Sequence, residues 1–394
     1  MTAYLTALGI NCALGMDQAE VARRLFAGDC SGVRSEAGWV PERKVAVAAV
    51  TGPLPLMAPA LARHDSRNNR LLLQAVQQIE PDIQAVIQGY GRDRIGVVLG
   101  TSTSGIDEAS KGIASYIRHQ RFPDGYDYRQ QMLSAPAQFL VELLQLRGPA
   151  YVISTACTSS AKALMSARRL LDLGVCDAVL CGGVDSLCGL TLNGFSSLEA
   201  VSAQRCNPFS YNRNGINIGE GAAVFLMTRE PFGGSIALLG SGATSDAYHI
   251  SAPHPDGDGA VLAMDKALRQ AGLAASDIAY LNLHGTATQH NDAMESHAVQ
   301  RLFPEGVLCS SSKPMTGHTL GAAGALEAAF CWLSLTSDGR LPPHLWDGQA
   351  DPQLPALRWA GVDDRLPPQG PRRLMSNSFA FGGSNISLIL GEAR

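Results

Sequence analysis

The chain has 394 residues, of which 46% are hydrophobic and 17% charged, and this composition excludes a disordered, fibrous or membrane-spanning protein. Its 35 acidic and 31 basic residues leave a net charge of -4 without a stripe of lysine and arginine, which argues against nucleic acid as a partner. A single hydrophobic core stops growing near about 250 to 300 residues, so the length predicts about two to three domains or one internally duplicated unit.

Cysteine usage and the N-terminal segment indicate the compartment. The nine cysteines are an odd number and form no CxxC pair, which favours reduced thiols in a cytosolic protein. The opening segment, MTAYLTALGINCALGMD, lacks the basic start of a secretory signal. No apolar run approaches the roughly 18 to 20 residues that a membrane-spanning helix needs. We therefore expect a cytoplasmic protein without a membrane span.

Short apolar runs that end in small residues predict strands buried on both faces, with helical patterns between them. In the first part of the chain we predict strands at 94–100, 150–155, 177–182 and 221–227, and a helix at 157–173. The second part repeats the theme with strands at 235–240, 278–283, 307–311 and 385–390. This alternation is typical of an α/β protein. We place a boundary near residue 231 and expect two similar halves, 1–230 and 231–394, that pack together.

The segment STACTSSA, residues 154–161, contains a candidate nucleophile. Cys157 lies where a buried strand is predicted to end and a helix to begin, so its sulfur is expected at the positive end of the helix dipole. That position favours the thiolate and raises nucleophilicity at neutral pH. The ordinary interpretation of a cysteine is a small buried hydrophobic residue, and we accept it for the other cysteines.

A second polar cluster, NLHGTATQHND, covers residues 282–292 and follows another predicted strand. It places His284 at the end of the strand, although a single histidine there is more often structural than catalytic. Thr286 and Thr288 are two residues apart, so in an extended loop they share one side and are able to bind a polar chain that enters the site.

A third cluster, SSSKPMTGHTLGAAGALE, covers residues 310–327 and leads into a glycine-rich helix start. It holds Lys313 and His318 five residues apart. A lysine is usually a solvated surface charge, but Lys313 follows an apolar strand and precedes proline, which fits burial beside Glu327. The last cluster, SNSFAFGGSN, residues 376–385, is a glycine turn before the final strand, and its two phenylalanines fit a core position equally well.

In this order and spacing, the four clusters resemble those of the β-ketoacyl-acyl-carrier-protein synthases, the decarboxylating condensing enzymes of the thiolase superfamily. The resemblance spans about residues 90–392 and includes Gly148-Pro149 and the stretch 207–222, whereas residues 1–90 match weakly. It implies a thiolase-like, five-layered αβαβα fold built from two related halves. That fold agrees with the two halves expected from the strand pattern.

The resemblance also implies roles for the cluster residues. The thiolate of Cys157 would take an acyl group from a carrier-protein thioester, and His284 and His318 would stabilise the enolate that malonyl-carrier protein forms when it loses carbon dioxide. Lys313 and Glu327 would be a buried pair that orients the histidine loop. From these roles we expect alanine variants of both histidines to keep acylation and to lose most condensation.

Further site residues follow from the same resemblance. The backbone N–H groups of Cys157 and Phe381 would form the oxyanion hole, and Phe381 would also be the gate between the acyl pocket and the malonyl site. Thr286 and Thr288 would hold the phosphopantetheine arm of the acyl carrier protein. The other substrate-binding residues are Phe379, Gly382 and Gly383. The resemblance implies no metal and no cofactor of its own, because the carrier protein brings the phosphopantetheine.

Several positions depart from the family pattern. Thr158 follows the nucleophile where alanine is usual, and Ser210 and Asn214 replace the acidic residues that commonly surround Arg213. In the glycine turn, Ala380 and Ser384 replace glycine and threonine; alanine has less backbone freedom than glycine, so we expect a gate loop of altered mobility. Together with the segment 289–292, these changes resemble specialised ketosynthases, for example those of aryl-polyene clusters.

Four alternatives were weighed against condensation. A non-decarboxylating thiolase needs a second cysteine in the C-terminal glycine turn, and a coenzyme-A-primed initiating synthase has asparagine in place of His318; neither fits. A cysteine hydrolase would leave the cluster from Lys313 to Glu327 unexplained. A non-catalytic chain-length-factor partner keeps the fold but loses the nucleophile, and Cys157 is present. Family members are dimers, and the sequence leaves open whether this chain pairs with itself or with a related ketosynthase-like subunit.

Overall fold

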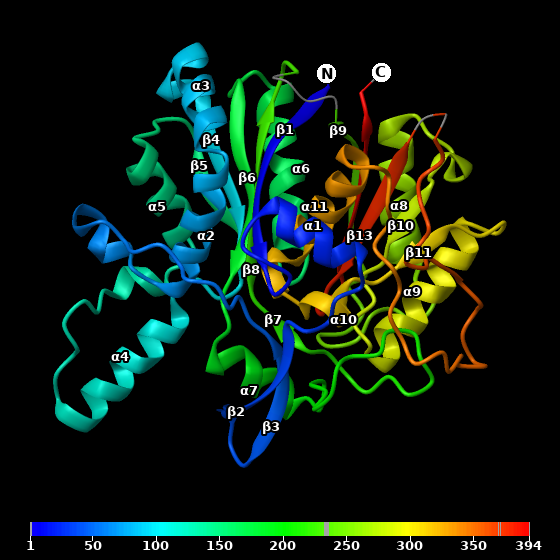
Figure 1. The fold of residues 1–394 in the computed structure, drawn as a ribbon, viewed down its shortest axis with the longest axis horizontal. Helices are drawn as coiled ribbons and strands as arrows, with labels where there is room; N and C mark the ends of the chain where they lie inside the picture. Colours follow the sequence, from blue (N-terminus) through cyan, green and yellow to red (C-terminus); the bar gives the residue numbers. More distant parts are fainter. Residues whose placement is uncertain (1, 232–235, 369, 371, 394) are drawn as a thin grey trace.

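The computed structural model describes residues 2–231, 236–368, 370 and 372–393, and it has the predicted α/β architecture (Figure 1). Within these residues 11 strands form one mixed sheet, in the order β12-β11-β10-β13-β14-β9-β1-β8-β6-β4-β5. The strands of the first half are β1 (Ala3–Cys12), β4 (Ile95–Gly100), β5 (Ala150–Ile153), β6 (Ala178–Asp185) and β8 (Gly221–Thr228). Those of the second half are β9 (Ile236–Ser245), β10 (Tyr280–Asn282), β11 (Leu308–Ser310), β12 (Arg358–Trp359), β13 (Arg373–Phe379) and β14 (Ser384–Glu392).

The two halves of the sheet repeat one topology. In the first half β1 pairs antiparallel with β8, and β8 with β6, while β6, β4 and β5 continue in parallel. In the second half β9, β14, β13, β10 and β11 follow one another with the same succession of antiparallel and parallel pairs. The halves join where Ala3 and Tyr4 of β1 pair with Leu238 and Ala237 of β9. The expectation of two related halves is confirmed.

Helices lie outside both half-sheets and also between them. The inner pair is α6 (Ser159–Asp172) and α11 (Ala323–Thr336), which pack on each other and on strands of both halves (Figure 1). The outer helices are α2 (Arg67–Gln78), α3 (Glu80–Tyr90) and α5 (Ala135–Leu144) on the first half, and α8 (Asp258–Ala271) and α9 (Gln289–Leu302) on the second. The result is the expected five-layered αβαβα arrangement, with one hydrophobic core in the middle and one under each outer layer.

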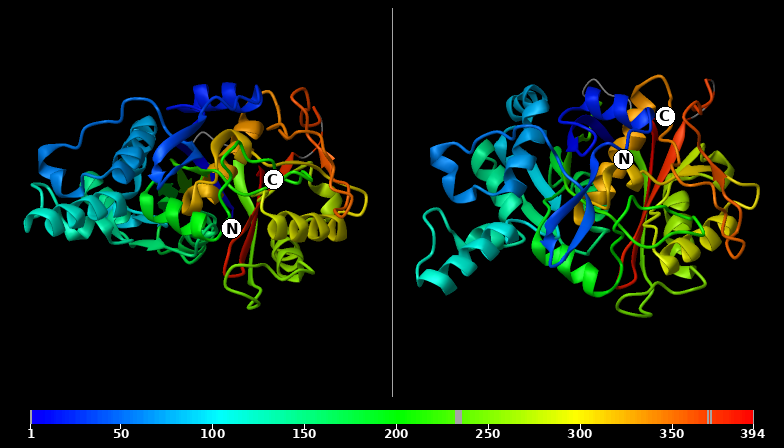
Figure 2. Two further views of the ribbon diagram at one scale, coloured as in Figure 1. Left: turned by 90° about the horizontal axis from the view of Figure 1, so that it is seen from below. Right: turned by 60° about the horizontal axis from the view of Figure 1, so that its bottom comes forward.

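The remaining elements surround these layers. They are the helices α1 (Gln18–Phe26), α4 (Ile106–His119), α7 (Gly189–Ser197) and α10 (Lys313–Thr316), the 3-10 helices η1 (Pro59–His64), η2 (Arg92–Arg94), η3 (Tyr128–Gln131), η4 (Ala275–Asp277) and η5 (Leu320–Ala322), and a small sheet of β2 (Val33–Val40), β3 (Arg43–Ala48) and β7 (Ile218–Gly219). Helix α4 stands out from the body in every view (Figure 1; Figure 2). Among the described residues, no helix combines the length and the hydropathy that crossing a bilayer requires.

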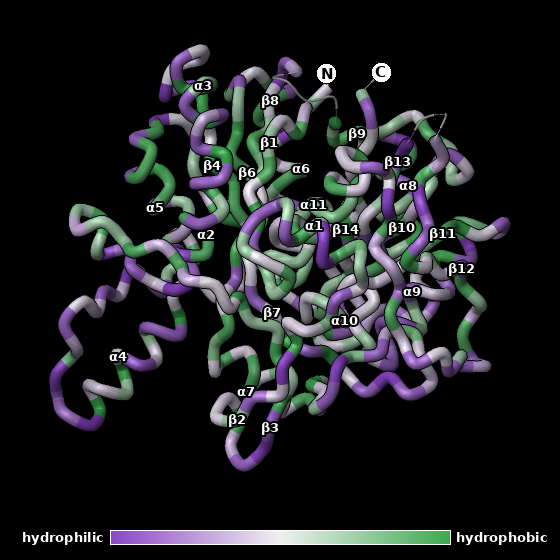
Figure 3. Tube along the Cα trace, in the orientation of Figure 1, coloured by the Kyte–Doolittle hydropathy of each residue, from purple (hydrophilic) through white to green (hydrophobic). Residues whose placement is uncertain are grey.

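Burial of the strands agrees with the sequence except at one edge. β4, β6 and β8 are buried along their whole length, and β6 and β8 run mostly hydrophobic in Figure 3. The prediction of a doubly buried strand was wrong for β5, where Ala150 is exposed and the next three residues are half-buried. The reason is that β5 is the last strand of the sheet, so one of its edges has no neighbouring strand among the residues that the structure describes.

The predicted limits of the elements hold to within a few residues. The predicted helix 157–173 is α6, which begins two residues after Cys157. The predicted strand 235–240 is the start of β9, except that Ser235 lies outside the described residues, as do the neighbouring residues 232–234. A division into halves at residue 231 therefore stays our proposal.

The end of β4 fixes the position of helix α6. A Cβ atom added to Gly100 would lie 2.3 Å from the backbone nitrogen of Ser160 and 2.5 Å from the carbonyl carbon of Ser159, both in the first turn of α6. Backbone atoms in two packed layers cannot yield as a flexible side chain does. The absence of a side chain at Gly100 is therefore what lets the helix start lie against the sheet.

We predict that Gly100→Ala lowers the free energy of unfolding by about 1 to 3 kcal/mol, because the added methyl group overpacks this contact. Urea denaturation measures the change. Gly89→Ala is the matched control: a Cβ there has no atom within 4 Å, and alanine favours a helix over glycine by up to about 1 kcal/mol. Equal unfolding midpoints for Gly100→Ala and the wild type would contradict this packing account.

Candidate active site

Cys157 sits in a tight elbow between β5 and α6. Ala156, directly before it, has a φ of 53°, a left-handed conformation that is strained for a residue with a Cβ. A hydrogen bond on the other side of Cys157 stabilises the elbow: the Thr158 hydroxyl donates to the Thr155 carbonyl oxygen at 2.6 Å. This bond gives a structural reason for the threonine that departs from the family pattern. The elbow turns the Cys157 side chain away from the sheet edge into a buried position.

The structure brings the three predicted catalytic side chains together. His318 Nε2 lies 2.9 Å from Cys157 Sγ, and the His284 ring meets the His318 ring edge to face with centroids 5.3 Å apart. The sulfur and one ring nitrogen of each histidine all lie within 4.8 Å of one another. Such a set could also hold a soft divalent metal, although the sequence predicts none here. All three residues are buried, so the cluster is sheltered from bulk water.

Both histidines are held neutral. Burial lowers the pKa of His284 well below its ordinary value, and the nearby positive charge of Lys313 acts in the same direction. The same two causes lower the pKa of His318. A neutral imidazole has one donor and one acceptor nitrogen. Nδ1 of each ring has no hydrogen-bond partner among the described residues, so no neighbouring group fixes which nitrogen carries the proton.

The protonation state of Cys157 differs from the sequence-based expectation. Burial raises the pKa of the thiol to about 12, and the charges of Glu327 and Asp185 add to this effect, whereas that of Lys313 opposes it. The sequence predicts that the helix dipole favours the thiolate, whereas burial in the folded chain favours the protonated thiol, and helix α6 begins two residues after Cys157. Cys157 is therefore a neutral thiol with an imidazole nitrogen within reach of its proton.

Lys313 and Glu327 form the buried ion pair that the sequence predicts. Lys313 Nζ donates to Glu327 Oε1 and to the backbone carbonyl oxygen of His284, and both side chains are almost fully buried. Burial raises the pKa of Glu327 to about 7, although Lys313 lowers it. The ammonium group thus ties the His284 loop to helix α11, and its charge helps to keep both imidazoles neutral.

Glu295 is a site residue that the sequence analysis missed. Its carboxylate accepts hydrogen bonds from the backbone N–H groups of His284 and Gly285, each at 2.8 Å. Burial raises the pKa of Glu295 to about 7. Asp292, one turn earlier in α9, accepts in the same way from Ala287 at 3.1 Å. The signal in the sequence is a pair of acidic residues three apart in the helix after the histidine loop.

The two predicted phosphopantetheine-binding threonines lie beside an opening. Thr286 is buried, and its hydroxyl oxygen is 3.0 Å from that of Thr288, so the two residues do share one side. We expected an extended loop between them, and this was wrong: Ala287 has a φ of 63°, which turns the backbone. Thr288 lines a pocket of about 630 Å³ together with Gln289, Phe381 and other residues.

The residue predicted to be the gate, Phe381, lies in the wall of this pocket. Phe381 lines the pocket and contacts Phe195 of α7, with ring centroids 6.0 Å apart, a contact that the sequence did not reveal. Gly382 and Gly383 form the turn between β13 and β14, with φ values of 85° and 77° that favour glycine. Phe379 belongs to the outer core of the second half and meets the His284 ring edge to face.

The other departures from the family pattern have structural partners. Ala380 is buried and donates its N–H to the Ser384 carbonyl oxygen at 2.8 Å, and the Ser384 hydroxyl accepts from Lys162 of α6 at 2.8 Å. Arg213 pairs with Asp351 at 2.6 Å, so a distant loop supplies the negative charge that residues near Arg213 lack.

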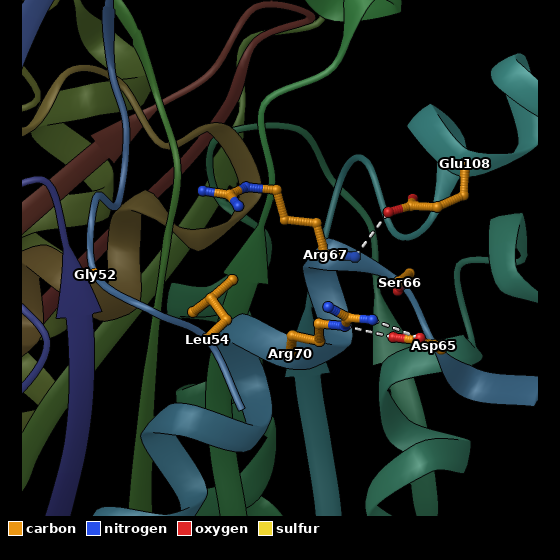
Figure 4. A pocket seen from close by; sticks show the side chains of 7 residues that line it. All are labelled: Gly52, Leu54, Asp65, Ser66, Arg67, Arg70 and Glu108. Atoms are coloured by element: carbon orange, nitrogen blue, oxygen red, sulfur yellow. Dashed lines mark hydrogen bonds and ion pairs between the residues drawn. The ribbon is translucent and has the colours of Figure 1, made fainter. Parts of the chain in front are cut away.

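A second hollow lies at the start of α2, and Figure 4 shows the side chains that line it. Arg70 is paired with Asp65, and the Arg67 backbone N–H donates to Glu108 at 2.7 Å. The Arg67 guanidinium leads away from the hollow to the fully buried Glu220. The charged groups of this hollow thus have partners within the protein, and none of the predicted site residues lines it.

Comparison with known proteins fits this geometry. The model of the N-terminal domain of β-ketoacyl synthases matches residues 6–231, and that of the C-terminal domain matches residues 236–346. The chain belongs to the β-ketoacyl synthase family. The buried Cys157, His284 and His318 are therefore found in a ketosynthase, in the positions that the sequence motifs indicated.

Individual relatives are ketosynthases as well. The chain is 32% identical to "3-oxoacyl-[acyl-carrier-protein] synthase 2" of Vibrio cholerae, over 84% of each chain. It is 38% identical to the protein of that name from Rhizobium meliloti, over 62% of this chain and 61% of the relative. Among solved structures, a chain of the complex between the ketosynthase ApeO and its chain length factor ApeC from Xenorhabdus doucetiae is 45% identical, with a TM-score of 0.94 over 100% of this chain and 98% of that one.

The raised pKa of Cys157 predicts how this ketosynthase reacts with iodoacetamide. Because burial raises the pKa of this thiol above the ordinary value of cysteine, the thiol stays protonated at neutral pH, and the thiolate fraction grows with pH. We expect the rate of Cys157 alkylation to rise continuously between about pH 7 and about pH 10, measured by peptide mass spectrometry with Cys157→Ser as the blank. A rate that levels off below about pH 8 would instead indicate a resting thiolate-imidazolium pair.

Proposed function

We propose that this ketosynthase catalyses the decarboxylative Claisen condensation of malonyl-carrier protein with an acyl group held on Cys157, giving a 3-oxoacyl-carrier protein in fatty-acid or polyene/polyketide chain elongation. The observation that carries the proposal is the contact of 2.9 Å between Cys157 Sγ and His318 Nε2, with His284 beside it in a buried site. A thiol that meets a neutral imidazole is suited to acyl transfer, and a second imidazole is suited to the enolate step.

In the first step, His318 Nε2 takes the proton of Cys157 while the sulfur attacks the carbonyl carbon of the acyl thioester. The new C–S bond forms, the bond to the carrier thiol breaks, and the proton passes to that leaving thiol. The backbone N–H groups of Cys157 and Phe381 donate no hydrogen bond to another described residue. They are thus free to stabilise the oxyanion, and the loss of one such donor typically costs about 10²- to 10³-fold in rate.

In the second step, malonyl-carrier protein loses carbon dioxide as its C–C bond breaks, and the electron pair becomes an enolate. His284 donates a hydrogen bond to the enolate oxygen from the ring nitrogen that faces it. His318 Nε2 has given its proton to the carrier thiol, so His318 donates only after its remaining proton moves from Nδ1 to Nε2, a change that the missing Nδ1 partners allow. The enolate carbon then attacks the acyl carbonyl, and Cys157 leaves as the thiolate and takes up a proton from solvent. Low local dielectric strengthens both donors.

Substrate delivery follows from the pocket beside the gate. We propose that Thr286 and Thr288 hold the phosphopantetheine arm of an acyl carrier protein and that Phe379, Gly382 and Gly383 complete the substrate-binding surface. Thr288 and Gln289 line the same pocket as Phe381, and the Thr286 hydroxyl oxygen lies 3.0 Å from that of Thr288. The protein needs no cofactor of its own for this chemistry, and its free cysteines fit a cytoplasmic setting.

A partner subunit is supported by an uncovered apolar surface. Helix α4 and the segment after it expose large hydrophobic residues, among them Ile113, Ile117, Tyr128 and Leu133, and the edge of β5 is open on the same half. Two similar solved structures are a ketosynthase with its chain length factor from Xenorhabdus doucetiae and the ishigamide ketosynthase/chain length factor. We propose that a second ketosynthase-like subunit covers α4, and that this chain is a specialised ketosynthase of the aryl-polyene type.

The function is tested by following the two steps separately. Incubation with acyl-carrier protein is expected to add the acyl mass to Cys157, as seen by intact-protein mass spectrometry. Malonyl-carrier protein is then expected to release carbon dioxide and to form a 3-oxoacyl product. Acylation that yields only free acid would indicate a hydrolase, and a Cys157 that stays unacylated even in an assembly whose other subunit is acylated would indicate a chain-length-factor role.

The histidine variants test the assigned roles. The structure changes the expectation for His318, since its contact with the thiol predicts that His318→Ala slows both acylation and condensation. His284→Ala is expected to keep acylation within about threefold and to lose about 10²- to 10³-fold in condensation. His297→Ala, at an exposed position of α9, is the control. If both site variants fail to acylate but decarboxylate malonyl-carrier protein normally, the role assignment is wrong.

The partner surface is tested by Ile117→Glu. A carboxylate at this exposed position of α4 would be buried without a partner in the assembly, so subunit association is expected to weaken by about tenfold or more. Native mass spectrometry of the protein alone, and co-expressed with the related subunit, distinguishes a homodimer from a heterodimer. Val362→Glu, exposed in the second half, serves as the control and is expected to leave assembly unchanged. Unchanged assembly in Ile117→Glu would place the interface elsewhere.

A further inference from the structure

Asp185, the last residue of β6, is a fully buried carboxylate near the nucleophile. Within the described part of the chain, no lysine, arginine or histidine forms an ion pair with it. A buried carboxylate without a cation is costly unless hydrogen bonds satisfy it. Asp185 accepts five, and they come from two segments that lie far apart in the sequence.

The first segment is the loop that directly follows β4. Thr101 Oγ1 donates to Asp185 Oδ1 at 2.6 Å, and Ser102 N donates to the same oxygen at 2.8 Å. The backbone N–H and the hydroxyl of Thr103 both donate to Oδ1 as well, each at 2.8 Å. One carboxylate oxygen therefore holds three consecutive residues of this loop.

The second segment is the turn that follows His318. Gly321 N donates to Asp185 Oδ2 at 2.6 Å, and this glycine belongs to η5, three residues after the histidine. A Cβ atom on Gly321 would lie 2.7 Å from Asp185 Oδ2 and 2.7 Å from Ser102 Oγ. The backbone of the turn thus lies directly against both the carboxylate and the loop after β4.

Each of the two segments contains a strained residue beside its contact with Asp185. Ser104, next to Thr103, has a φ of 49°, and Leu320, next to Gly321, has a φ of 51°. Non-glycine residues keep this left-handed conformation only where the surroundings over-determine it. The hydrogen bonds to Asp185 are the contacts that act on both strained positions at once.

We infer that Asp185 is a positioning residue that holds the turn after His318, and with it the imidazole, against Cys157. The backbone of His318 itself is bonded to residues 217–219, because His318 N donates to the Asn217 carbonyl oxygen at 2.6 Å and Gly219 N donates to the His318 carbonyl oxygen at 2.9 Å. Asp185 anchors the turn that follows. This role rests on the proposed function, since it assigns the contact between His318 and the thiol to catalysis.

Asp185→Asn separates the two anchors. The amide oxygen can keep the four donors of the loop after β4, but the amide NH₂ group then faces Gly321 N–H, and two donors cannot bond. We expect acylation and condensation turnover to fall by about 10- to 100-fold, with the KM for malonyl-carrier protein within about twofold of the wild type. The rate at which iodoacetamide alkylates Cys157 is expected to change as well, because the His318 imidazole beside the thiol has moved.

Two controls separate positioning from general destabilisation. Asp177→Asn makes the same substitution just before the other end of β6, where Asp177 pairs with Arg94 and Arg229, and its kinetics are expected to stay within about twofold of the wild type. Hydrogen exchange followed by mass spectrometry is expected to show faster exchange around residues 318–323 in Asp185→Asn and unchanged exchange in the outer helices.

The outcomes decide the role. Turnover within about threefold of the wild type in Asp185→Asn, or unchanged exchange around Gly321, would overturn it. Should Asp185→Asn not fold, Thr103→Val removes one donor to Asp185 Oδ1 and keeps the backbone. This variant is expected to speed hydrogen exchange in both segments and to slow turnover by about three- to tenfold. If Thr103→Val changes neither quantity, the role of Asp185 is overturned too. Exchange and alkylation need no condensation, so a wild type without 3-oxoacyl product refutes the proposed function and leaves the anchor testable.

Discussion

The contact between Cys157 Sγ and His318 Nε2 depends on how the two halves of the chain pack. The first half supplies the thiol at the elbow before α6, and the second half supplies one imidazole from the loop between β10 and α9 and the other from the turn between α10 and η5. The inner layer, where α6 and α11 pack on each other, is what brings these segments within hydrogen-bond distance. A site assembled in this way is only as precise as the packing between the halves.

Burial then decides the charge state of the site. Removal of water raises the pKa of the thiol and of the glutamates and lowers that of the imidazoles, so the resting cluster is neutral around one charged lysine. A neutral cluster suits chemistry in which negative charge appears first on a tetrahedral intermediate and then on an enolate, because the donors are in place before the charge develops. Lys313 serves both purposes, as it ties the His284 loop to α11 and keeps protons off the rings.

The sequence predicted those features that repeat a local pattern or a motif. The helix after Cys157, the burial of Lys313 beside Glu327 and eight of the eleven strands of the main sheet follow from apolar periodicity and from the residues around each position, whereas β1, β12 and β13 were not predicted. The failures have physical causes. β5 is half-buried because it is the edge strand, and a local pattern does not reveal the order of the strands. The loop turns at Ala287, whose backbone N–H donates to the Asp292 carboxylate of α9. Phe195 and Asp185 were missed because their partners are far away in the sequence, whereas the partners of Glu295 are only ten and eleven residues away and the acidic pair in α9 was the signal for it.

The residue pattern by itself predicted the α/β class and two similar halves, and the resemblance carried by the four motifs predicted the ketosynthase family and, as a proposal, Cys157 as the nucleophile with His284 and His318 as its two histidines. These properties reside in short segments whose residue types already limit what the segments can do. Only the tertiary structure decided that Cys157 rests as a neutral thiol, that His318 rather than His284 contacts it, and that Asp185 joins two strained turns. Such properties depend on desolvation and on distances between segments of different halves, and these arise only when the layers pack.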